Sequence, residues 1–207
     1  IIIPTLNEEV RLAYLLASLQ KQSFTDFEII IADAGSSDTT VKIAENFEAR
    51  LVPGGLPAVG RNKGASAALG EILLFLDADM CLDNVDYLKD CIREFLERNL
   101  IVATSPLKSE SVLIFDRVLI WIYDLYSRLT SSILPHLPGF CIFVKRQTHE
   151  LLNGFDESVV FAEDIEYGRR AGRLGAFGFL QAHRIPYCNR RLERDGRLAT
   201  SIRYVLA

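Results

Sequence analysis

The sequence predicts one α/β domain in which helices flank a mainly parallel sheet. Two observations in residues 1–105 support this fold class: short apolar runs alternate with segments of helical periodicity, and the runs are nearly continuous, as in strands buried on both faces. A third observation concerns the whole chain of 207 residues, in which no internal repeat or long polar linker marks a second domain. We therefore expect residues 1–105 and 106–207 to be two halves of one domain, with some antiparallel pairing in the second half.

Five strands are expected in the first half, because β-branched and other apolar residues gather in five short runs. These runs are residues 1–3, 27–32, 49–52, 71–76 and 100–104. Helices are expected between them where apolar residues recur every three or four positions, at residues 12–19, 41–47 and 88–95. Asn7 is the expected N-cap of the first of these helices.

The second half is expected to contain a strand and three helices. The strand is predicted at residues 139–145, and the helices at residues 110–134, 147–152 and 164–174. The first of these helices carries a wide apolar arc, but four charged residues interrupt it, so we do not expect it to span a membrane. Three alternatives stay open for the arc: packing on the sheet, an oligomer contact such as a homodimer, or a peripheral membrane contact that serves a lipid-linked acceptor.

Composition narrows the class of protein. Hydrophobic residues make up 49% of the chain and charged residues 24%, which excludes a disordered chain. The net charge of −4 argues against a nucleic-acid-binding protein. The four cysteines, Cys81, Cys91, Cys141 and Cys188, form no C-x-x-C pair. Their spacing favours reduced thiols in a cytoplasmic protein. The given sequence opens on an apolar run with no signal-peptide pattern, and its start without Met suggests that residues of the native N-terminus are missing.

Ligands of parallel α/β sheets bind beyond the carboxyl ends of the strands, so the residues that follow each strand are the candidate site. Pro4 is expected to end the first strand, and it presents Thr5, Asn7 and Glu8 at a helix start. These residues are either ligand contacts or ordinary cap and first-turn residues. Asp33, at the tip of the second strand, can accept N–H donors from a base, or else its loop simply caps a helix.

The segment Gly60-Arg61-Asn62-Lys63-Gly64 places two cations between glycines near an expected helix start. Arg61 and Lys63 could bind an anionic group, and the alternative is a solvated basic turn. The segment matches neither the phosphate-binding loop of nucleotide triphosphatases nor the dinucleotide-binding glycine motif, so those classes are disfavoured.

The strongest single pattern is an apolar run that leads directly into Asp77-Ala78-Asp79. Two carboxylates at the end of a buried strand repel each other and are costly to desolvate, and a divalent cation relieves both effects. Aspartate oxygens favour Mg²⁺ or Mn²⁺, especially where substrate phosphates complete the coordination. Two surface aspartates that cap the next loop are the alternative.

Two later segments also carry candidate residues. A carboxylate within residues 163–166 could act as a general base on an acceptor hydroxyl, although acids are common at helix starts. Arg190 and Arg191 lie in a basic segment that suits phosphate oxygens, with a solvated tail face as the alternative.

Taken together in this order, the segments resemble those of the family-2 glycosyltransferases, which have the GT-A fold. The resemblance extends over nearly the whole chain and rests on the motifs Pro4-Thr5-x-Asn7-Glu8, Asp33-x-Gly35-Ser36-x-Asp38, Gly60-Arg61-Asn62-x-Gly64, Asp77-Ala78-Asp79, Gly154-Phe155-Asp156 and Glu163-Asp164. It implies an enzyme that binds a nucleoside-diphosphate sugar in residues 1–105 and an acceptor in residues 106–207. It further implies transfer of the sugar to a hydroxyl or a lipid phosphate with inversion.

The resemblance also implies roles for individual residues. The nucleoside would be held by Pro4, Thr5, Asn7, Glu8 and Asp33, and the nucleotide would be contacted by Arg61 or Lys63. Asp77 would lie near the ribose or sugar, Asp79 would bind Mn²⁺ or Mg²⁺, and Asp164 would be the catalytic base. The diphosphate would be covered by Arg190 and Arg191. A metal ion and arginines at that place would stabilise the charge on the leaving diphosphate.

One family feature is missing from the chain. Processive members carry a Gln-x-x-Arg-Trp motif near the end, whereas residues 189–196 look like the arginine-rich segment of small non-processive members. Some glycosyltransferases place a metal-binding histidine near the position of His183, but His136, His149 and His183 are all expected to be structural. Two rival functions stay open: a sugar-phosphate nucleotidyltransferase and a non-catalytic module that binds nucleotide sugars.

Overall fold

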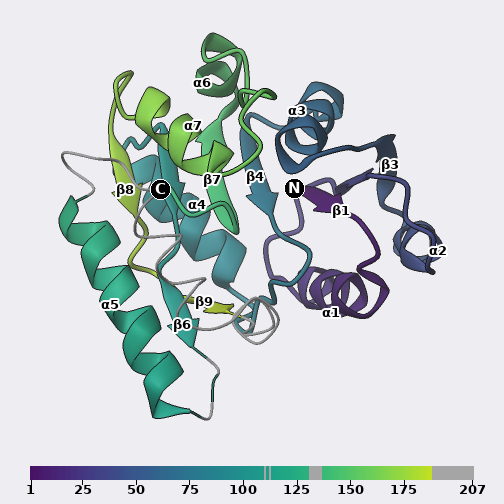
Figure 1. Ribbon diagram of the computed structural model, residues 1–207, viewed down its shortest axis with the longest axis horizontal. Helices are drawn as coiled ribbons and strands as arrows, with labels where there is room; N and C mark the ends of the chain where they lie inside the picture. The colour runs from purple at the N-terminus through teal and green to yellow at the C-terminus, as the bar shows by residue number, and fades with distance from the viewer. Residues whose placement is uncertain (110, 112, 131–136, 188–207) are drawn as a thin grey trace.

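The computed structural model describes residues 1–109, 111, 113–130 and 137–187, and within them the fold is α/β (Figure 1). The strands are β1 (Ile2–Thr5), β2 (Ile30–Asp33), β3 (Arg50–Pro53), β4 (Ile72–Leu76), β5 (Val102–Thr104), β6 (Leu107–Ser109), β7 (Cys141–Lys145), β8 (Phe177–Phe179) and β9 (Ile185–Tyr187). The helices are α1 (Glu9–Gln20), α2 (Thr40–Asn46), α3 (Pro57–Ala67), α4 (Tyr87–Glu97), α5 (Ile114–Thr130), α6 (Arg146–Leu151) and α7 (Glu163–Ala171).

The main sheet of these residues has the strand order β3-β2-β1-β4-β7-β5-β8, and β6 pairs separately with β9. Strand β7 runs antiparallel to both of its neighbours, whereas the other pairs in the main sheet are parallel. The prediction of a mainly parallel sheet with antiparallel pairing in the second half is confirmed.

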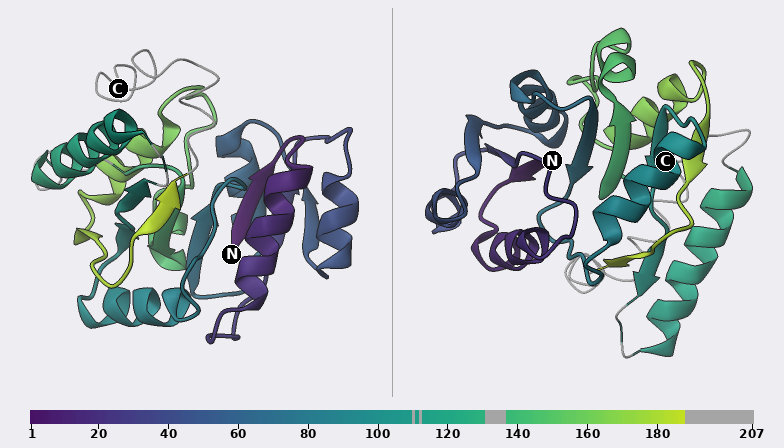
Figure 2. Two further views of the ribbon diagram at one scale, coloured as in Figure 1. Left: turned by 90° about the horizontal axis from the view of Figure 1, so that it is seen from below. Right: turned by 180° about the vertical axis from the view of Figure 1, so that it is seen from behind.

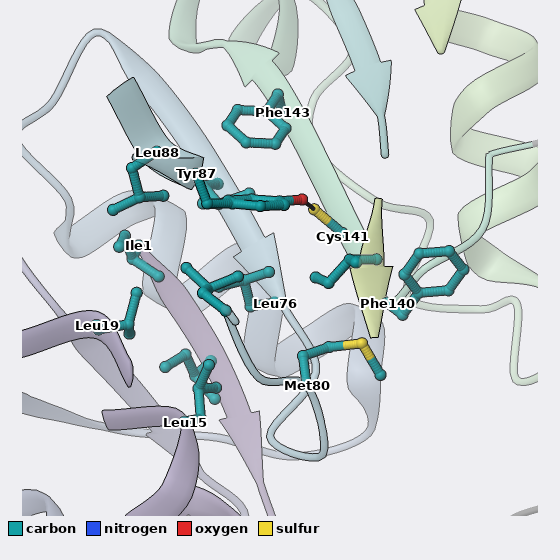
Figure 3. Close-up of a cluster of buried hydrophobic side chains, with 14 of the residues drawn as sticks. Ile1, Leu15, Leu19, Leu76, Met80, Tyr87, Leu88, Phe140, Cys141 and Phe143 are labelled. Atoms are coloured by element: carbon teal, nitrogen blue, oxygen red, sulfur yellow. Dashed lines mark hydrogen bonds between the residues drawn. The ribbon is translucent and has the colours of Figure 1, made fainter. Parts of the chain in front are cut away.

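The two faces of the sheet bury two separate apolar clusters, because successive side chains of a strand point to opposite faces. Ile3 and Leu74 pack with α1, α2 and α4 on one face, whereas Ile2 and Phe75 pack with α3 and α7 on the other. Figure 2 shows helices on both sides of the sheet. The first cluster includes Tyr87, whose hydroxyl lies at the sulfur of Cys141 (Figure 3). Burial on both faces explains why the strands read as continuous apolar runs.

Strand β1 does not end at Pro4, as the sequence suggested, but continues through Thr5. Its odd-numbered carbonyls face β2, since Ile1 and Thr5 accept backbone hydrogen bonds from that side. The missing N–H of Pro4 therefore faces β4, where the pairing of β1 involves Ile2 alone. Proline is tolerated at this position because it interrupts no ladder hydrogen bond.

The N-cap prediction for Asn7 was also wrong. Helix α1 begins at Glu9, and Asn7 lies before it with a φ of 54°, in the left-handed region that asparagine tolerates. Its side-chain oxygen accepts hydrogen bonds from Ser37 instead of from the helix. Asn7 thus connects two loops and leaves the helix end uncapped by its side chain.

The segment from Gly60 to Gly64 lies inside helix α3 rather than near its start, because α3 begins at Pro57. The glycines allow this helix to approach β1 closely. A Cβ added to Gly64 would collide with the side chain of Ile2. Close packing of α3 on β1 buries Arg61, which faces the edge of the sheet where β4 ends.

The second half contains the predicted strand as β7 and the three predicted helices as α5, α6 and α7. Strands β6, β8 and β9 were not predicted, because three residues are too few to show a periodic pattern. No helix of the described residues has the length and apolar character needed to cross a membrane. Helix α5 packs against β6 with Ile120 buried, whereas much of its apolar arc is exposed, so an oligomer contact and a membrane contact both stay predictions.

Candidate active site

The loops after β1 and β2 meet because the parallel register places Thr5 beside Asp33. Thr5 Oγ1 donates a hydrogen bond of 3.0 Å to Asp33 Oδ2, and Ser36 Oγ donates one of 2.5 Å to the same oxygen. The backbone N–H groups of Gly35 and Ser36 donate to Asp33 Oδ1 at 3.0 and 2.8 Å. Burial opposes ionisation of Asp33, but these hydrogen bonds outweigh it and hold its pKa below the usual value. Asp33 is therefore a fixed anion at the tip of β2.

The same two loops are joined further out by backbone and side-chain hydrogen bonds. The backbone N–H of Asn7 donates to Ser36 Oγ at 2.9 Å, and Asn7 Oδ1 accepts from the N–H of Ser37 at 2.8 Å. The N–H of Glu8 donates to Thr40 Oγ1 at 2.9 Å. The structure thus brings the predicted residues of the first loop together with Asp33 in one connected wall.

A buried arginine forms the centre of the site. Arg61 is only 3% exposed, and its guanidinium donates to Glu163 Oε1 at 2.6 Å, to Asp77 Oδ1 at 3.0 Å and to the carbonyl of Gly139 at 3.2 Å. Burial lowers the pKa of Arg61, but the neighbouring carboxylates outweigh burial and raise it above its usual value. The alternative of a solvated basic turn is therefore wrong for Arg61. This cation joins the end of β4 to the start of α7.

Asp164 lies beside this cluster in the first turn of α7. Its Oδ2 accepts a hydrogen bond of 2.5 Å from the N–H of Gly139, and its Oδ1 accepts one of 2.9 Å from the N–H of Ile165. Burial and the charge of Glu163 raise the pKa of Asp164 to about 6, although Arg61 and the two N–H donors act in the opposite direction. A carboxyl group with this pKa can exchange a proton near neutral pH.

Gly139 allows the cluster to form because it contacts both ends of it. Its N–H binds Asp164, and its carbonyl accepts from Arg61. A Cβ at this position would lie 2.6 Å from Asp164 Oδ2 and 3.1 Å from Arg61 Nη2. A larger residue would therefore displace the carboxyl or the guanidinium. Gly139 was not predicted as a site residue, although its place at the start of a predicted strand was a usable signal.

Asn62 is a second residue that the analysis missed. Its Oδ1 accepts from the N–H of Phe155 at 2.8 Å, and its Nδ2 donates to the carbonyl of Phe155 at 2.9 Å. Gly154 has a φ of 75°, and a Cβ there would collide with the Asn62 amide. The side chain of Phe155 also lies under Arg61, whose Cζ is 5.3 Å from the ring centroid. The Gly154-Phe155-Asp156 motif therefore supports the buried arginine.

The two aspartates after β4 occupy different surroundings. Asp77 is paired with Arg61, and the residues from Asp77 to Met80 form a turn closed by a hydrogen bond of 3.1 Å between their backbones. Asp79 follows in this turn with its Oδ1 buried. Among the described residues, no group of three or more His, Cys, Asp or Glu side chains could hold a metal.

The carboxylates of Asp77 and Asp79 fit a divalent metal ion that takes only one or two ligands from the protein. Mg²⁺ and Mn²⁺ in nucleotide sites are bound through one or two carboxylates, with substrate phosphates and waters as the remaining ligands. Asp79 supplies one such carboxylate, while Arg61 already engages Asp77. The site therefore fits a divalent ion that arrives with a diphosphate, and not a closed protein cage.

The remaining candidates lie away from this cluster or outside the described residues. Lys63 donates from Nζ to the carbonyl of Gly54 at 3.0 Å, on the exposed side of α3. Arg190 and Arg191 lie outside the described residues, as does His136.

The two described histidines have structural partners. His149 Nδ1 lies 3.0 Å from the hydroxyl of Tyr167, within an aromatic cluster that includes Phe75, and burial lowers its pKa to about 4. His183 Nε2 lies 2.9 Å from Asp90 Oδ2. Both sets of contacts agree with the structural role expected for these side chains.

A model of the family described as "Glycosyl transferase family 2" matches residues 1–152 of the chain. The chain belongs to glycosyl transferase family 2. The resemblance inferred from the ordered motifs is confirmed, and the four motifs from Pro4 to Asp79 fall within the matched residues.

One curated relative of this family 2 chain and two solved structures give the match more detail. Poly(ribitol-phosphate) beta-N-acetylglucosaminyltransferase TarS of Staphylococcus aureus is 37% identical over 100 residues, which cover 44% of this chain and 17% of TarS. The crystal structure of S. aureus TarS 1–349 in complex with UDP-GlcNAc superposes with a TM-score of 0.72 at 25% identity, over 90% of this chain and 57% of that one. The mannosyltransferase PcManGT from Pyrobaculum calidifontis, solved with GDP-Man and Mn²⁺, gives a TM-score of 0.78 at 21% identity, over 98% and 59%.

These superpositions confirm the GT-A-like fold class. The chain spans less than two thirds of the length of each of these relatives. What their names say about donors, metals and acceptors is therefore a property of those proteins, and for the present chain it is a matter of proposal.

Proposed function

We propose that this family 2 chain is a metal-dependent, inverting glycosyltransferase that moves a sugar from a nucleoside-diphosphate sugar to an acceptor hydroxyl or lipid phosphate. One observation carries the proposal: buried Arg61 holds Asp77, at the end of β4, against the first turn of α7, where Asp164 has a pKa of about 6. A residue of the donor half and a candidate base of the acceptor half thus share one buried cluster. We assign the donor to residues 1–105 and the acceptor to residues 106–207.

The donor site is proposed at the wall formed by the loops after β1 and β2. Pro4, Thr5, Asn7 and Glu8 line one loop. Asp33 at the tip of β2 would accept an N–H donor from a base in place of one of the four hydrogen bonds that it accepts from Thr5, Gly35 and Ser36. The TarS complex with UDP-GlcNAc and the PcManGT complex with GDP-Man support a nucleoside-diphosphate sugar as the donor class. Asp77 is proposed to lie near the ribose or sugar.

Asp79 is proposed to hold Mn²⁺ or Mg²⁺ together with the donor diphosphate, and the PcManGT complex with Mn²⁺ supports this choice. A divalent ion at this place neutralises part of the charge that develops on the leaving diphosphate. Arg190 and Arg191 are proposed to add positive charge on the same phosphates, since Arg side chains suit phosphate oxygens. Lys63, which lies away from the cluster, is left out of this proposal.

Asp164 is proposed as the base. For a hydroxyl acceptor, the acceptor oxygen forms a bond to the anomeric carbon while the bond from that carbon to the diphosphate oxygen breaks. The electron pair leaves with the nucleoside diphosphate, and the acceptor proton passes to Asp164. One in-line displacement inverts the anomeric configuration and needs no protein nucleophile. A pKa of about 6 keeps Asp164 mostly ionised at neutral pH and still basic enough to take the proton.

The products of the reaction test the proposal. A transferase releases nucleoside diphosphate, whereas the rival nucleotidyltransferase releases pyrophosphate and a binding module releases neither. Asp164→Asn should lower turnover by about 10²-fold or more with donor affinity unchanged, since general-base catalysis contributes about that much. Release of pyrophosphate, or full turnover by the variant on a hydroxyl acceptor, would refute the proposed base or the proposed reaction.

A further inference from the structure

Helix α5 is oriented opposite to an ordinary surface helix. Its inward side includes Asp116, Asp124 and Ser127, which are 1%, 6% and 0% exposed, with Ile120 between them. Its outward side is apolar: Ile114 is 75% exposed and Trp121 is 59% exposed. Surface helices normally turn their apolar stripe to the core and their charges to water. The outward orientation of the apolar side of α5 needs an explanation that the sugar-transfer site does not supply.

The exposed apolar residues of α5 form one continuous arc. They recur at intervals of four, seven, eight, eleven and fifteen positions from the first, as Ile114, Val118, Trp121, Ile122, Leu125 and Leu129. At 3.6 residues per turn, these positions fall within about 100° of one another, and the row is about 22 Å long. Figure 1 shows α5 at the outer edge of the fold, on the side away from α1 and α2.

Both carboxylates of residues 113–129 are turned away from this arc and are compensated inside. Asp116 Oδ2 accepts a hydrogen bond of 2.7 Å from Ser111. Asp124 Oδ2 lies 3.3 Å from Arg184 Nη1 and 3.3 Å from Arg128 Nε. The helix therefore presents no carboxylate on its outward side.

The edges of the arc carry residues typical of a membrane interface. By helical position, Arg117 borders one edge, whereas the aromatic residues Phe115 and Tyr126 border the other. Arg128 lies on the same edge as Arg117, but its guanidinium is turned to Asp124 and to the ring of Phe179. Interfacial helices combine an apolar face with cations and aromatic rings at its borders, because the rings and the stems of arginine sit at headgroup depth.

We propose that α5 lies in the plane of an anionic lipid bilayer, with the arc of residues 114–129 in the acyl boundary and Arg117 at the headgroup phosphates. Its 17 residues are fewer than the roughly 20 that a membrane-spanning helix usually needs. A second copy of this chain fits less well, because the same arc on that copy offers no carboxylate to Arg117. The proposal does not depend on sugar transfer.

Trp121 is the only tryptophan of the chain, so its fluorescence reports directly on this arc. The whole chain is mixed with vesicles of phosphatidylcholine and with vesicles that also contain 30% phosphatidylglycerol. We expect flotation with the anionic vesicles, a blue shift of the Trp121 emission, and quenching by lipids brominated on the acyl chain. Absence of quenching, or equal flotation with both compositions, would overturn the proposal.

A matched pair of variants distinguishes α5 from other exposed apolar residues. Ile122→Glu, at a residue 51% exposed on α5, should weaken partitioning by about tenfold or more. Leu96→Glu, at a residue 55% exposed on α4, should leave it unchanged. Equal partitioning of the two folded variants onto anionic vesicles would contradict the assignment of the lipid contact to α5. Sedimentation equilibrium without lipid completes the test, since a dimer that Ile122→Glu dissociates would assign the arc to a second copy instead.

Discussion

Removing the buried cation at Arg61 should both destabilise the protein and shift its pH dependence. Arg61→Met keeps an apolar side chain of related length but leaves Asp77 and Glu163, whose side chains are 14% and 13% exposed, without their guanidinium partner. Breaking a buried ion pair by removing one partner costs about 3–5 kcal/mol. For a domain of this size each kcal/mol corresponds to about 2–4 °C in the unfolding midpoint. We therefore expect the midpoint to fall by roughly 6–20 °C.

Thermal unfolding followed by circular dichroism at neutral pH measures this change. The matched control is Arg50→Met, because the Arg50 guanidinium donates to the exposed carbonyl of Ala67. An exposed contact of this kind should change stability by about 0.5 kcal/mol or less. Arg61→Lys restores the charge without the forked geometry and should recover part of the loss. If Arg61→Met unfolds within about 2 °C of the control, the buried cluster is not held by this residue.

The same variant has a second readout that lost stability alone would not produce. Arg61 lowers the pKa of Asp164, although burial and Glu163 raise it further, to a net value of about 6. Without Arg61 the pKa of Asp164 should rise, so the pH at which turnover reaches half its maximum should move upward from about 6. An unchanged pH profile in the folded variant would show that Arg61 does not act on the base.

Three further predictions follow from the site. Asp79→Ala should remove the Mn²⁺-dependent part of nucleoside-diphosphate affinity in calorimetry, and equal affinity with and without the substitution would exclude Asp79 as a metal ligand. Gly139→Ala would place a methyl group 2.6 Å from Asp164 Oδ2, so turnover should fall by about tenfold or more while donor affinity is retained. Asp164→Asn should become more stable relative to wild type as the pH rises from about 4 to about 6. The folded pKa of Asp164 is raised above its ordinary 3.8, so its ionisation in that window opposes folding by up to about 3 kcal/mol. A stability difference in urea that is constant across this range would contradict that reasoning.

The strands of the first half could be predicted closely because their signal is local. Burial on both faces requires consecutive apolar residues, and the run predicted at 71–76 corresponds to β4, Ile72–Leu76. The antiparallel strand at 139–145 was found for the same reason. Strand β8, Phe177–Phe179, has three residues and gains its stability from pairing with β5, so its own sequence holds too little pattern.

The site was predictable in its residues but not in its connections. Asp77, Asp164 and Arg61 were all singled out, each from its position after a strand or near a helix. Their arrangement depends on partners that are distant in sequence, since Arg61 pairs with Glu163, 102 positions away. A basic residue between glycines has the same local pattern whether it faces water or three acids. The glycines at 60 and 64, which bring α3 close to β1, decide between the two, and only tertiary packing reveals their effect.

Helix α5 is a second case in which the local sequence pattern predicts an element but not its tertiary packing. Its periodicity correctly predicted an amphipathic helix, but periodicity alone does not say which face is buried. The default assumption, that the apolar arc faces the core, fails because Asp124 faces inward instead. Arg184, 60 positions away in the sequence, donates to Asp124 where α5 packs against β6. Turning Asp124 outward would separate its buried carboxylate from the half-exposed guanidinium of Arg184 and from that of Arg128. The inward aspartate and the outward apolar arc are therefore two consequences of one packing arrangement.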